Sequence, residues 1–331
     1  MTDKIFEKTN PHIFNGNLES WMTHLPPVLK NLPIIQLAIP GSHNTMTYGI
    51  KRSNDVGPDK PKWLRVLSRF FSFISKPIIY NWSVTQYEDV TIQLNGGIRY
   101  LDLRLATKSS NNESIYFVHG LYGSEVTEPL ESVDHWLTAH PEEVVLLDCQ
   151  HFYEFTKENH RYFVDKIKRI FGNKICPATR NLVDISLSWL NERKYQVLVI
   201  YRNEIAAGEK HVWPSGLWPT PWPDTVDPDK MLQFLELRIR NRTPNVGFVS
   251  QCLLTPNSAY VVKHLWGSLY RDLATLCRNA SLPWIRQHKP GILGLNVVIT
   301  DFIAYDNYLF SRTVIQRNNE LLRTPQTAHS P

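Results

Sequence analysis

Short apolar runs recur along the whole chain, separated by stretches in which apolar residues return with helical spacing. Each run is rich in Val, Ile, Leu, Tyr or Phe, which is typical of a strand buried on both faces. The runs cover residues 32–40, 97–106, 114–120, 142–150, 194–202, 245–254 and 293–302. Candidate helices between them include residues 132–141, 159–171 and 231–241. Strands that alternate with helices predict parallel β-α-β units.

Seven strands of this kind fit an α/β barrel in which the eighth strand is not visible, or an open doubly wound sheet. The residues at the strand ends favour the barrel, because the carboxyl ends of barrel strands meet at one mouth. Each run finishes in side chains that ionise or form hydrogen bonds: His43, Asn44, Asp102, Arg104, His119, Asp148, Arg202, Gln251 and Asp301. Any one of them alone could be a buried structural group, but a set drawn from successive strand ends indicates a site.

The chemistry of this set points to phosphodiester transfer. It holds two histidines and two arginines, and the sequence contains no HExxH motif, no phosphate-binding glycine loop of the Walker type and no GxSxG. One imidazole can take a proton from an attacking hydroxyl while the other gives a proton to the leaving oxygen. A guanidinium stabilises the charge on phosphorus, because its planar fork meets phosphate oxygens and stays ionised.

Four segments together resemble the X domain of phosphatidylinositol-specific phospholipase C. They are LAIPGSHNTMTYGI, NWSVTQ, GIRYLDLRLA and YFVHGLYG. The resemblance is strongest to the small X-domain-containing subfamily, which lacks the additional modules of the large eukaryotic enzymes, and it runs from about Leu32 to Phe302. It implies a distorted, incompletely closed TIM barrel. We expect that barrel over residues 32–322, after an N-terminal extension (1–31) that packs on it and before a flexible C-terminal tail (323–331).

The resemblance also assigns roles to individual residues. His43 matches the first catalytic histidine, the general base, and His119 matches the second, the general acid. Asp102 and Arg104 match the D-x-R of the metal-independent bacterial enzymes, with Arg104 as the clamp on phosphorus and Asp102 holding a neighbour.

Four further residues are expected at the substrate. Arg202 resembles an arginine that contacts inositol, and Asp301 a carboxylate that orients the first histidine. Asn44 matches the residue that follows the first histidine in calcium-dependent relatives, and Asp148 lies next to the family position that Cys149 occupies. The strand 142–150 departs from the family pattern, because Cys149 stands where relatives carry Glu or Lys.

Asn44 and Arg104 give opposite indications about metal. Calcium-dependent relatives have Asn at the position of Asn44, whereas the metal-independent site has Asp there. Calcium needs six to eight oxygen ligands, and a guanidinium at Arg104 would repel it. We therefore expect no metal and no cofactor, with calcium as the alternative.

The expected activity is a phosphoinositide phospholipase C that releases diacylglycerol and an inositol phosphate, with roles in lipid degradation and signal transduction. The alternative is a catalytically weak barrel that binds phosphoinositides or proteins. Glycerophosphodiester phosphodiesterases use a similar barrel, but their paired metal-binding carboxylates are not visible in this sequence.

Positive charge is concentrated in one segment. The chain has 36 Lys and Arg against 31 Asp and Glu, a net charge of +5. Residues 51–76 carry seven basic and two acidic residues, and within 63–74 Arg65 and Arg69 lie four apart among large apolar side chains. A basic amphipathic helix is typical of a membrane-surface element, and a helix packed on the protein is the alternative. No nucleic-acid-binding motif appears, so nucleic acid is not an expected partner.

The remaining patterns bound the location of the protein. Apolar residues make up 42% and charged residues 20%, as in globular proteins. Four cysteines without paired spacing indicate reduced thiols. No secretory signal and no apolar run of spanning length is visible. A loop at 211–225 alternates tryptophan with proline and either packs on the body or forms a rim at the mouth. We expect a cytoplasmic protein that associates peripherally with anionic membranes.

Overall fold

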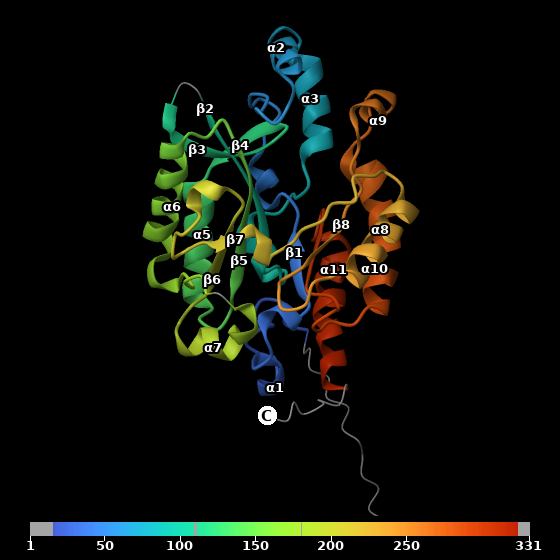
Figure 1. Cartoon of the computed structure of the whole chain (residues 1–331). Helices are drawn as coiled ribbons and strands as arrows, with labels where there is room; N and C mark the ends of the chain where they lie inside the picture. The colour runs from blue at the N-terminus through green and yellow to red at the C-terminus, as the bar shows by residue number, and fades with distance from the viewer. Residues whose placement is uncertain (1–15, 109–110, 180, 324–331) are drawn as a thin grey trace, which may run out of the picture.

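The computed structural model of the chain describes residues 16–108, 111–179 and 181–323, and a single curled sheet forms its centre (Figure 1). The strands are β1 (Ile39–Ser42), β2 (Tyr100–Lys108), β3 (Asn111–His119), β4 (Leu121–Glu125), β5 (Val145–Tyr153), β6 (Val197–Tyr201), β7 (Trp213–Pro214), β8 (Val249–Cys252) and β9 (Val297–Thr300). Their order is β7-β6-β5-β2-β1-β9-β8, all parallel, and β3 and β4 continue from β2 as antiparallel strands.

The barrel is not closed by an eighth parallel strand in the described part of the chain. An irregular segment after β7 takes that place, since Gly247 N–H donates to the Leu217 carbonyl (2.8 Å) and Val249 N–H to the Pro219 carbonyl (2.9 Å). These two bonds join the segment to β8, so the sheet curls almost completely around. The prediction of a distorted, incompletely closed α/β barrel is confirmed.

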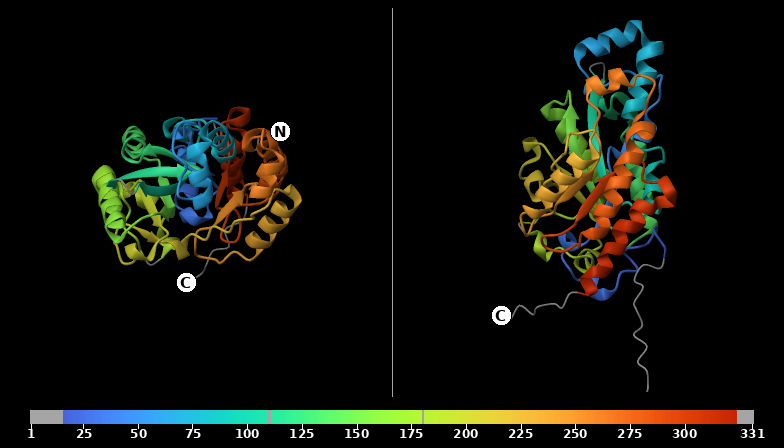
Figure 2. Two further views of the ribbon diagram at one scale, coloured as in Figure 1. Left: turned by 90° about the horizontal axis from the view of Figure 1, so that it is seen from above. Right: turned by 90° about the vertical axis from the view of Figure 1, so that its right-hand side faces the viewer.

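Most of the helices cover the outside of the sheet (Figures 1 and 2). The helices are α1 (Pro27–Lys30), α2 (Lys62–Phe70), α3 (Ser72–Ser83), α4 (Val90–Asn95), α5 (Thr127–Ala139), α6 (Lys157–Phe171), α7 (Leu187–Glu192), α8 (Pro228–Arg240), α9 (Ser258–Lys263), α10 (Thr275–Gln287) and α11 (Tyr305–Gln316). Of these, α2 and α3 stand above the sheet and α1 lies below it. Successive side chains along each strand point alternately outward and inward, so one hydrophobic core lies between the sheet and the helices and a second lies inside the barrel. Leu101 and Leu103 pack outward against the helices, whereas Tyr100 and Leu146 fill the barrel interior.

All seven apolar runs contain a strand, but two predictions of detail were wrong. Residues 32–40 begin with a 3₁₀ turn (Ile34–Gln36), so the strand starts only at Ile39. The run 114–120 is not a parallel barrel strand: it belongs to β3, which runs antiparallel to β2. The reason is connection length, because two residues between β2 and β3 allow a hairpin but not a crossover helix. β4 and β7 were not predicted.

The base of the barrel is covered by residues 16–31. Trp21, Leu25 and Leu29 are buried in the inner core, and Trp21 Nε1 donates to the Gly97 carbonyl (2.9 Å). Residues 1–15 of the expected extension and 324–331 of the expected tail lie outside the described residues.

A buried ion pair holds this cover in place. Arg99 and Glu143 are completely buried and 2.7 Å apart. Glu143 also accepts from the hydroxyl of Thr23 (2.6 Å), while Arg99 donates to the Glu19 carbonyl (2.6 Å). Because Arg99 precedes β2 and Glu143 precedes β5, the pair links the starts of these two strands to the N-terminal segment.

The basic segment forms a helical hairpin above the mouth. The helix expected over 63–74 is broken at Phe71, where α2 ends and α3 begins. Figure 2 shows this hairpin standing beyond the rest of the body. Trp63, Phe70 and Phe73 are 67%, 75% and 75% exposed, so the apolar face is not packed on the protein. No helix in the described ranges is long and apolar enough to cross a bilayer.

Most of the tryptophans in the Trp–Pro loop and all four cysteines are buried in the body of the protein. In the Trp–Pro loop, Trp213 and Trp218 are fully buried and Trp222 is about half exposed, so most of this loop packs on the body. All four cysteines are free and buried.

Candidate active site

His43 lies directly after β1, at the mouth of the barrel, and its backbone is clamped from three sides. Its N–H donates to the Thr300 carbonyl at the end of β9 (3.1 Å). Its carbonyl accepts from the hydroxyl of Thr85 (2.9 Å) and the side-chain amide of Gln86 (3.1 Å). Asn44 then turns the chain away in the left-handed region (φ 42°). The imidazole is thereby fixed at the strand end.

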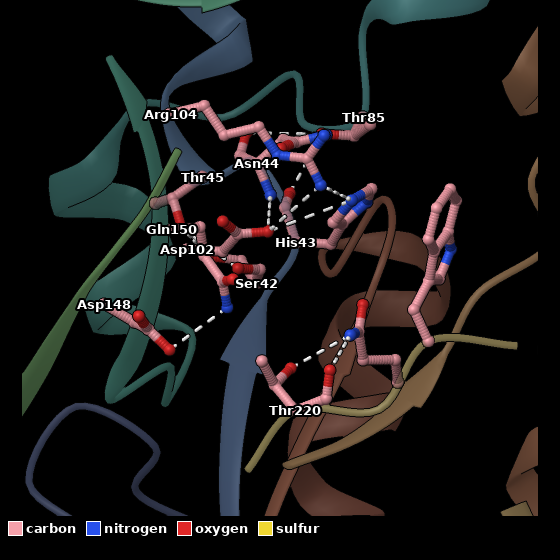
Figure 3. Close-up of polar contacts among 12 residues, drawn as sticks. Ser42, His43, Asn44, Thr45, Thr85, Asp102, Arg104, Asp148, Gln150 and Thr220 are labelled. Atoms are coloured by element: carbon pink, nitrogen blue, oxygen red, sulfur yellow. Dashed lines mark hydrogen bonds and ion pairs between the residues drawn. The ribbon is translucent and has the colours of Figure 1, made fainter. Parts of the chain in front are cut away.

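Two neighbours, Asp301 and Arg104, orient the His43 ring, and Figure 3 shows the side of the ring that faces Arg104. Nδ1 lies 2.7 Å from Asp301 Oδ1, and Nε2 lies 3.1 Å from Arg104 Nη2. Because a guanidinium only donates and a carboxylate only accepts, the two contacts fix the neutral tautomer with the proton on Nδ1. The lone pair of Nε2 is then turned toward Arg104 at the mouth, and a substrate hydroxyl would take the place of this contact.

Asp102 and Arg104 project from the same face of β2, two residues apart. Asp102 Oδ2 accepts from the Asn44 N–H (3.1 Å) and lies 3.8 Å from His43 Nε2 and 3.9 Å from Arg104 Nη2. Asp102 is almost completely buried, whereas Arg104 keeps about a fifth of its side chain exposed. The buried Asp102 carboxylate therefore fixes the turn at Asn44, and the Arg104 guanidinium extends to the solvent-exposed mouth of the barrel.

His119 reaches the same mouth from the end of β3. The rings of His43 and His119 are 6.2 Å apart between centroids and inclined at 71°. Burial, followed by the positive charges of Arg104 and Lys60, holds the pKa of His119 well below its ordinary value. In the described part of the chain no group forms a hydrogen bond with its ring, so it has no carboxylate partner.

A short loop before α2 supports His119 through the next residue. Gly120 N–H donates to Asp59 Oδ2 (2.7 Å), and the Gly120 carbonyl accepts from the N–H of Gly57 (2.8 Å). Gly120 has φ 71°, and a Cβ there would meet the Ser83 hydroxyl at 2.0 Å, so the position requires glycine. We call residues 55–60 the His119 support loop.

Asp148, in the middle of β5, and Arg202, directly after β6, form an ion pair. Arg202 donates from Nε and Nη2 to the two Asp148 oxygens (2.8 and 2.6 Å), and the Tyr100 hydroxyl also donates to Asp148. Burial alone would lower the pKa of Arg202, but the Asp148 carboxylate outweighs it and raises that pKa. Asp148 is fully buried and fully engaged, so it positions Arg202 rather than facing the mouth.

Sequence reasoning missed Gln150 and His151. The register between β2 and β5 shifts after Cys149, which pairs with Leu103, so that His151 rather than Gln150 lies opposite Arg104. Gln150 donates to Asp148 (3.1 Å), and Figure 3 shows these two side chains beside Asp102. Partial desolvation at the mouth, together with the charge of Arg104, lowers the pKa of His151. Cys149 is buried in the outer core and takes no part in the site.

The donor set near Asn44 does not fit calcium. Asp102 is its single carboxylate, and the Arg104 guanidinium occupies the adjacent position. No cluster of three or more metal-ligating side chains occurs in residues 16–108, 111–179 and 181–323. Asn44 Oδ1 and Nδ2, Asp102 Oδ1 and Arg104 Nε are buried without partners around a small cavity. These mixed donors and acceptors suit water better than a divalent cation.

Comparison with known proteins settles the family. The sequence is 38% identical over 303 residues to human PI-PLC X domain-containing protein 3, covering 91% of this chain and 94% of the relative. The chain belongs to the PI-PLC X domain-containing proteins. Mouse protein 2 of this family is 38% identical over 316 residues (95% and 91% covered), and human protein 1 is 36% identical over 317 residues (94% and 95%). The sequence matches no protein-family model.

Solved structures confirm the fold of these PI-PLC X domain proteins. A mutant of the phosphatidylinositol-specific phospholipase C from Staphylococcus aureus superposes with a TM-score of 0.63 at 16% identity, covering 92% of this chain and 97% of that chain. The enzyme from Listeria monocytogenes gives 0.60 at 17% identity, with 91% and 98% covered. The similarity supports a phospholipase C-like barrel.

Proposed function

We propose that this protein is a phosphoinositide-specific phospholipase C that works by two-histidine acid/base catalysis. The proposal is supported above all by one observation: His43 Nε2, its neighbour Arg104 and the ring of His119 converge on one opening at the barrel mouth. Two imidazoles and a guanidinium around one opening are what phosphodiester transfer requires. The family relatives and the bacterial phospholipase C fold support the same reaction class.

In the proposed reaction the inositol 2-hydroxyl attacks phosphorus. His43 Nε2 removes the hydroxyl proton, and Asp301 stabilises the imidazolium that forms at Nδ1. A new bond joins the inositol oxygen to phosphorus while the bond to the glycerol oxygen breaks. His119 gives that oxygen a proton, which releases diacylglycerol and a cyclic inositol phosphate. Water then opens part of the cyclic ester to the inositol phosphate.

Arg104 carries the charge that develops on the phosphoryl oxygens. Its Nη2 already donates toward His43 Nε2, so it is aimed at the place where the reacting oxygens meet. Asp102 holds both the Arg104 guanidinium and the turn at Asn44 in their positions relative to each other. Arg202, held by Asp148, retains donors for a hydroxyl of the inositol ring.

His119, the proposed general acid, is the group of the site whose protonation state suits its role least. Because the pKa of His119 lies well below its usual range, little of it is protonated at neutral pH. The phosphate of a bound substrate raises that pKa, but we expect a slow enzyme with an optimum on the acidic side. This observation favours the second candidate function, a barrel that binds phosphoinositides or proteins with little turnover.

We also propose that catalysis needs no calcium and takes place at an anionic membrane surface. Arg104 supplies the positive charge that a metal would otherwise bring. The exposed apolar face of α2–α3 stands at the mouth (Figure 1), and α9 and the following loop add Val262 and Trp266, 65% and 84% exposed. Phosphoinositides would enter the mouth from the bilayer between these elements, with the protein bound peripherally.

Product analysis on phosphatidylinositol tests the proposed function. Wild-type protein should release diacylglycerol and cyclic inositol phosphate with and without a chelator, and His43→Ala should not. His24→Ala, an exposed histidine in the cover at the base, is the matched control. A folded wild type that releases no diacylglycerol from any phosphoinositide would favour the binding function.

A further inference from the structure

A polar pocket lies between the α2–α3 hairpin and the outer end of the β2–β4 strands, apart from the catalytic mouth. Its volume is about 480 Å³. The charged residues in its wall are Arg65, Arg69, Lys76, Lys108, Asp55 and Glu154. We call this space the lateral pocket.

The positive charges in the lateral pocket outnumber their internal partners. Arg65 lies 2.9 Å from Glu154, and Lys76 lies 3.5 Å from Asp55. Arg69 and Lys108 have no carboxylate within ion-pair distance among the described residues. The pocket therefore holds two uncompensated cations, and its two ion pairs are partly exposed, so an incoming anion can compete with their carboxylates.

Lys108 is held in position rather than free in solvent. Its ammonium lies 4.6 Å from the ring centre of Tyr116 and 4.8 Å from that of Tyr122. Tyr122 is buried and donates its hydroxyl to the Thr107 carbonyl (3.0 Å). An ammonium that rests on a fixed aromatic ring loses little further freedom when it binds an anion.

Arg69 completes the arrangement from the opposite wall. It lies four residues after Arg65 on α2, so both guanidiniums share the helix face that lines the pocket. Trp63 and Phe70 on the same helix are exposed instead. The pocket thus opens beside the face that we propose to contact lipid.

The lateral pocket cannot hold the phosphate that reacts at His43. Lys108 follows Arg104 by four residues on β2, and at about 3.3 Å per residue the two positions are roughly 13 Å apart. Guanidinium and ammonium groups without partners in a polar pocket are typical of phosphate recognition. We propose that the lateral pocket is a second, non-catalytic binding site for a phosphate that is not esterified on both sides, either the phosphate monoester headgroup of an anionic phospholipid or free phosphate.

The test compares a pocket variant with a control variant of equal charge. Arg69→Gln with Lys108→Gln empties the pocket of its unpaired cations. Lys51→Gln with Lys62→Gln removes two exposed cations of the same segment that do not line the pocket. Arg69→Glu alone is a second pocket variant at an exposed position with no ion pair to break.

Phosphatidic acid is the lipid probe, because it carries a phosphate monoester but no inositol and so cannot be a substrate at the mouth. Binding is measured to phosphatidylcholine vesicles containing phosphatidic acid, and to vesicles of equal surface charge containing phosphatidylserine. A separate calorimetric titration with inorganic phosphate, without lipid, tests the soluble source.

If the site takes lipid phosphate, the pocket variant should bind phosphatidic acid vesicles at least about tenfold more weakly than the wild type, and phosphatidylserine vesicles no more weakly than the control variant does. If it takes free phosphate, the pocket variant should lose affinity in the titration while the control keeps it. The proposal is overturned if pocket and control variants behave alike in both arms. Equal losses on the two kinds of vesicle, with no loss in the phosphate titration, would also overturn it, since only general charge attraction would then remain.

Discussion

A histidine acts as a base only when an unprotonated nitrogen faces the proton to be removed, and at His43 two neighbours create that condition. Asp301 accepts from Nδ1, and Arg104 approaches Nε2 as a donor. His119 has no comparable partner among the described residues and carries a lowered pKa. The two imidazoles are thus unequal, one prepared for its role and the other dependent on the substrate.

Loss of either imidazole should abolish most turnover. His43→Ala and His119→Ala should each lower the rate by roughly 10²- to 10⁴-fold, the usual contribution of a positioned proton-transfer group. Release of diacylglycerol from phosphatidylinositol measures the effect, and thermal unfolding checks that the variants fold. If His119→Ala kept the full rate, another group, with His151 the first candidate, would be the acid.

Asn44→Asp should speed the reaction and move its optimum to higher pH. The new carboxylate would lie in the cavity that Asn44 shares with Arg104 and Val118, one residue before His119. A carboxylate near an imidazole raises its pKa by about 1–3 units, so His119 would stay protonated to higher pH. A pH–rate profile shows the shift, and an unchanged profile with normal folding would contradict this account. Asn44→Ser is the uncharged control.

The residues that we propose to react were easier to predict from the sequence than the residues that support them. His43 and Arg202 could be predicted because they follow parallel strands whose ends meet at one mouth. Arg104 lies in the middle of β2 and His119 ends the antiparallel β3, so these two depended on the resemblance rather than on the strand-end rule. His151 and Gln150 could not be predicted, because a register shift between β2 and β5 decides which of them lies opposite Arg104. A shift of one residue exchanges the two faces of a strand, and no local pattern of residues announces it. The pairing of Asp148 with Arg202 likewise depends on two strands brought together by the fold.

At the scale of elements, the α2–α3 hairpin is the feature that the apolar pattern alone describes poorly. Large apolar side chains predict burial in most proteins, yet here Phe70 and Phe73 face solvent. The break at Phe71 turns one predicted helix into two. The basic and apolar composition predicted a membrane-surface element, a role that remains our proposal, whereas the shape of the segment depends on contacts with the support loop and β4.

Replacing Phe70 and Phe73 with serine should weaken binding to phosphatidylinositol vesicles by about tenfold or more, because each buried aromatic ring contributes about 1.5–3 kcal/mol. Vesicle sedimentation measures the affinity. The control is Leu237→Ser with Leu276→Ser, two exposed apolar residues (57% and 49%) on α8 and α10 at the barrel side. Equal losses in both double variants would mean that membrane contact is not localised to the hairpin.

At the scale of the whole molecule, the barrel is held at its base by the Arg99–Glu143 pair. Glu143→Gln should lower the free energy of unfolding by about 3 kcal/mol or more, because it leaves a buried guanidinium without its countercharge. Glu142→Gln is the matched control: its pair with Lys30 is partly exposed to solvent, so the loss should stay below about 1 kcal/mol. Urea unfolding compares the two, and similar losses would contradict the special role of the buried pair.

Removal of divalent cations should leave the activity of the whole protein intact, because Arg104 stands where a calcium ion would need oxygen ligands. Turnover of phosphatidylinositol is compared in chelator and in excess calcium, with Arg104→Ala as an inactive reference. Complete inactivation by the chelator, reversed by calcium, would show that Asn44 and Asp102 bind the metal despite the guanidinium.

The closure of the barrel was predictable in kind but not in detail. Seven apolar runs and a missing eighth indicated an incomplete barrel. The segment that fills the gap is rich in proline and lacks strand periodicity, so only the backbone bonds to Gly247 and Val249 reveal its place.

The support loop couples the α2–α3 hairpin mechanically to His119, the general acid that we propose. Asp59 precedes α2 by three residues and holds the N–H next to His119. If contact with a lipid surface tilts α2, the position of His119 therefore changes as well. Conversely, a headgroup that contacts His119 changes the position of the hairpin. By thermodynamic reciprocity the two effects are equal in free energy. Binding of a headgroup should then change the affinity of the protein for a bilayer by a certain factor. Binding to a bilayer should change the affinity of the protein for the headgroup by the same factor. Asp59→Asn, which weakens the linking hydrogen bond, should bring that factor toward one.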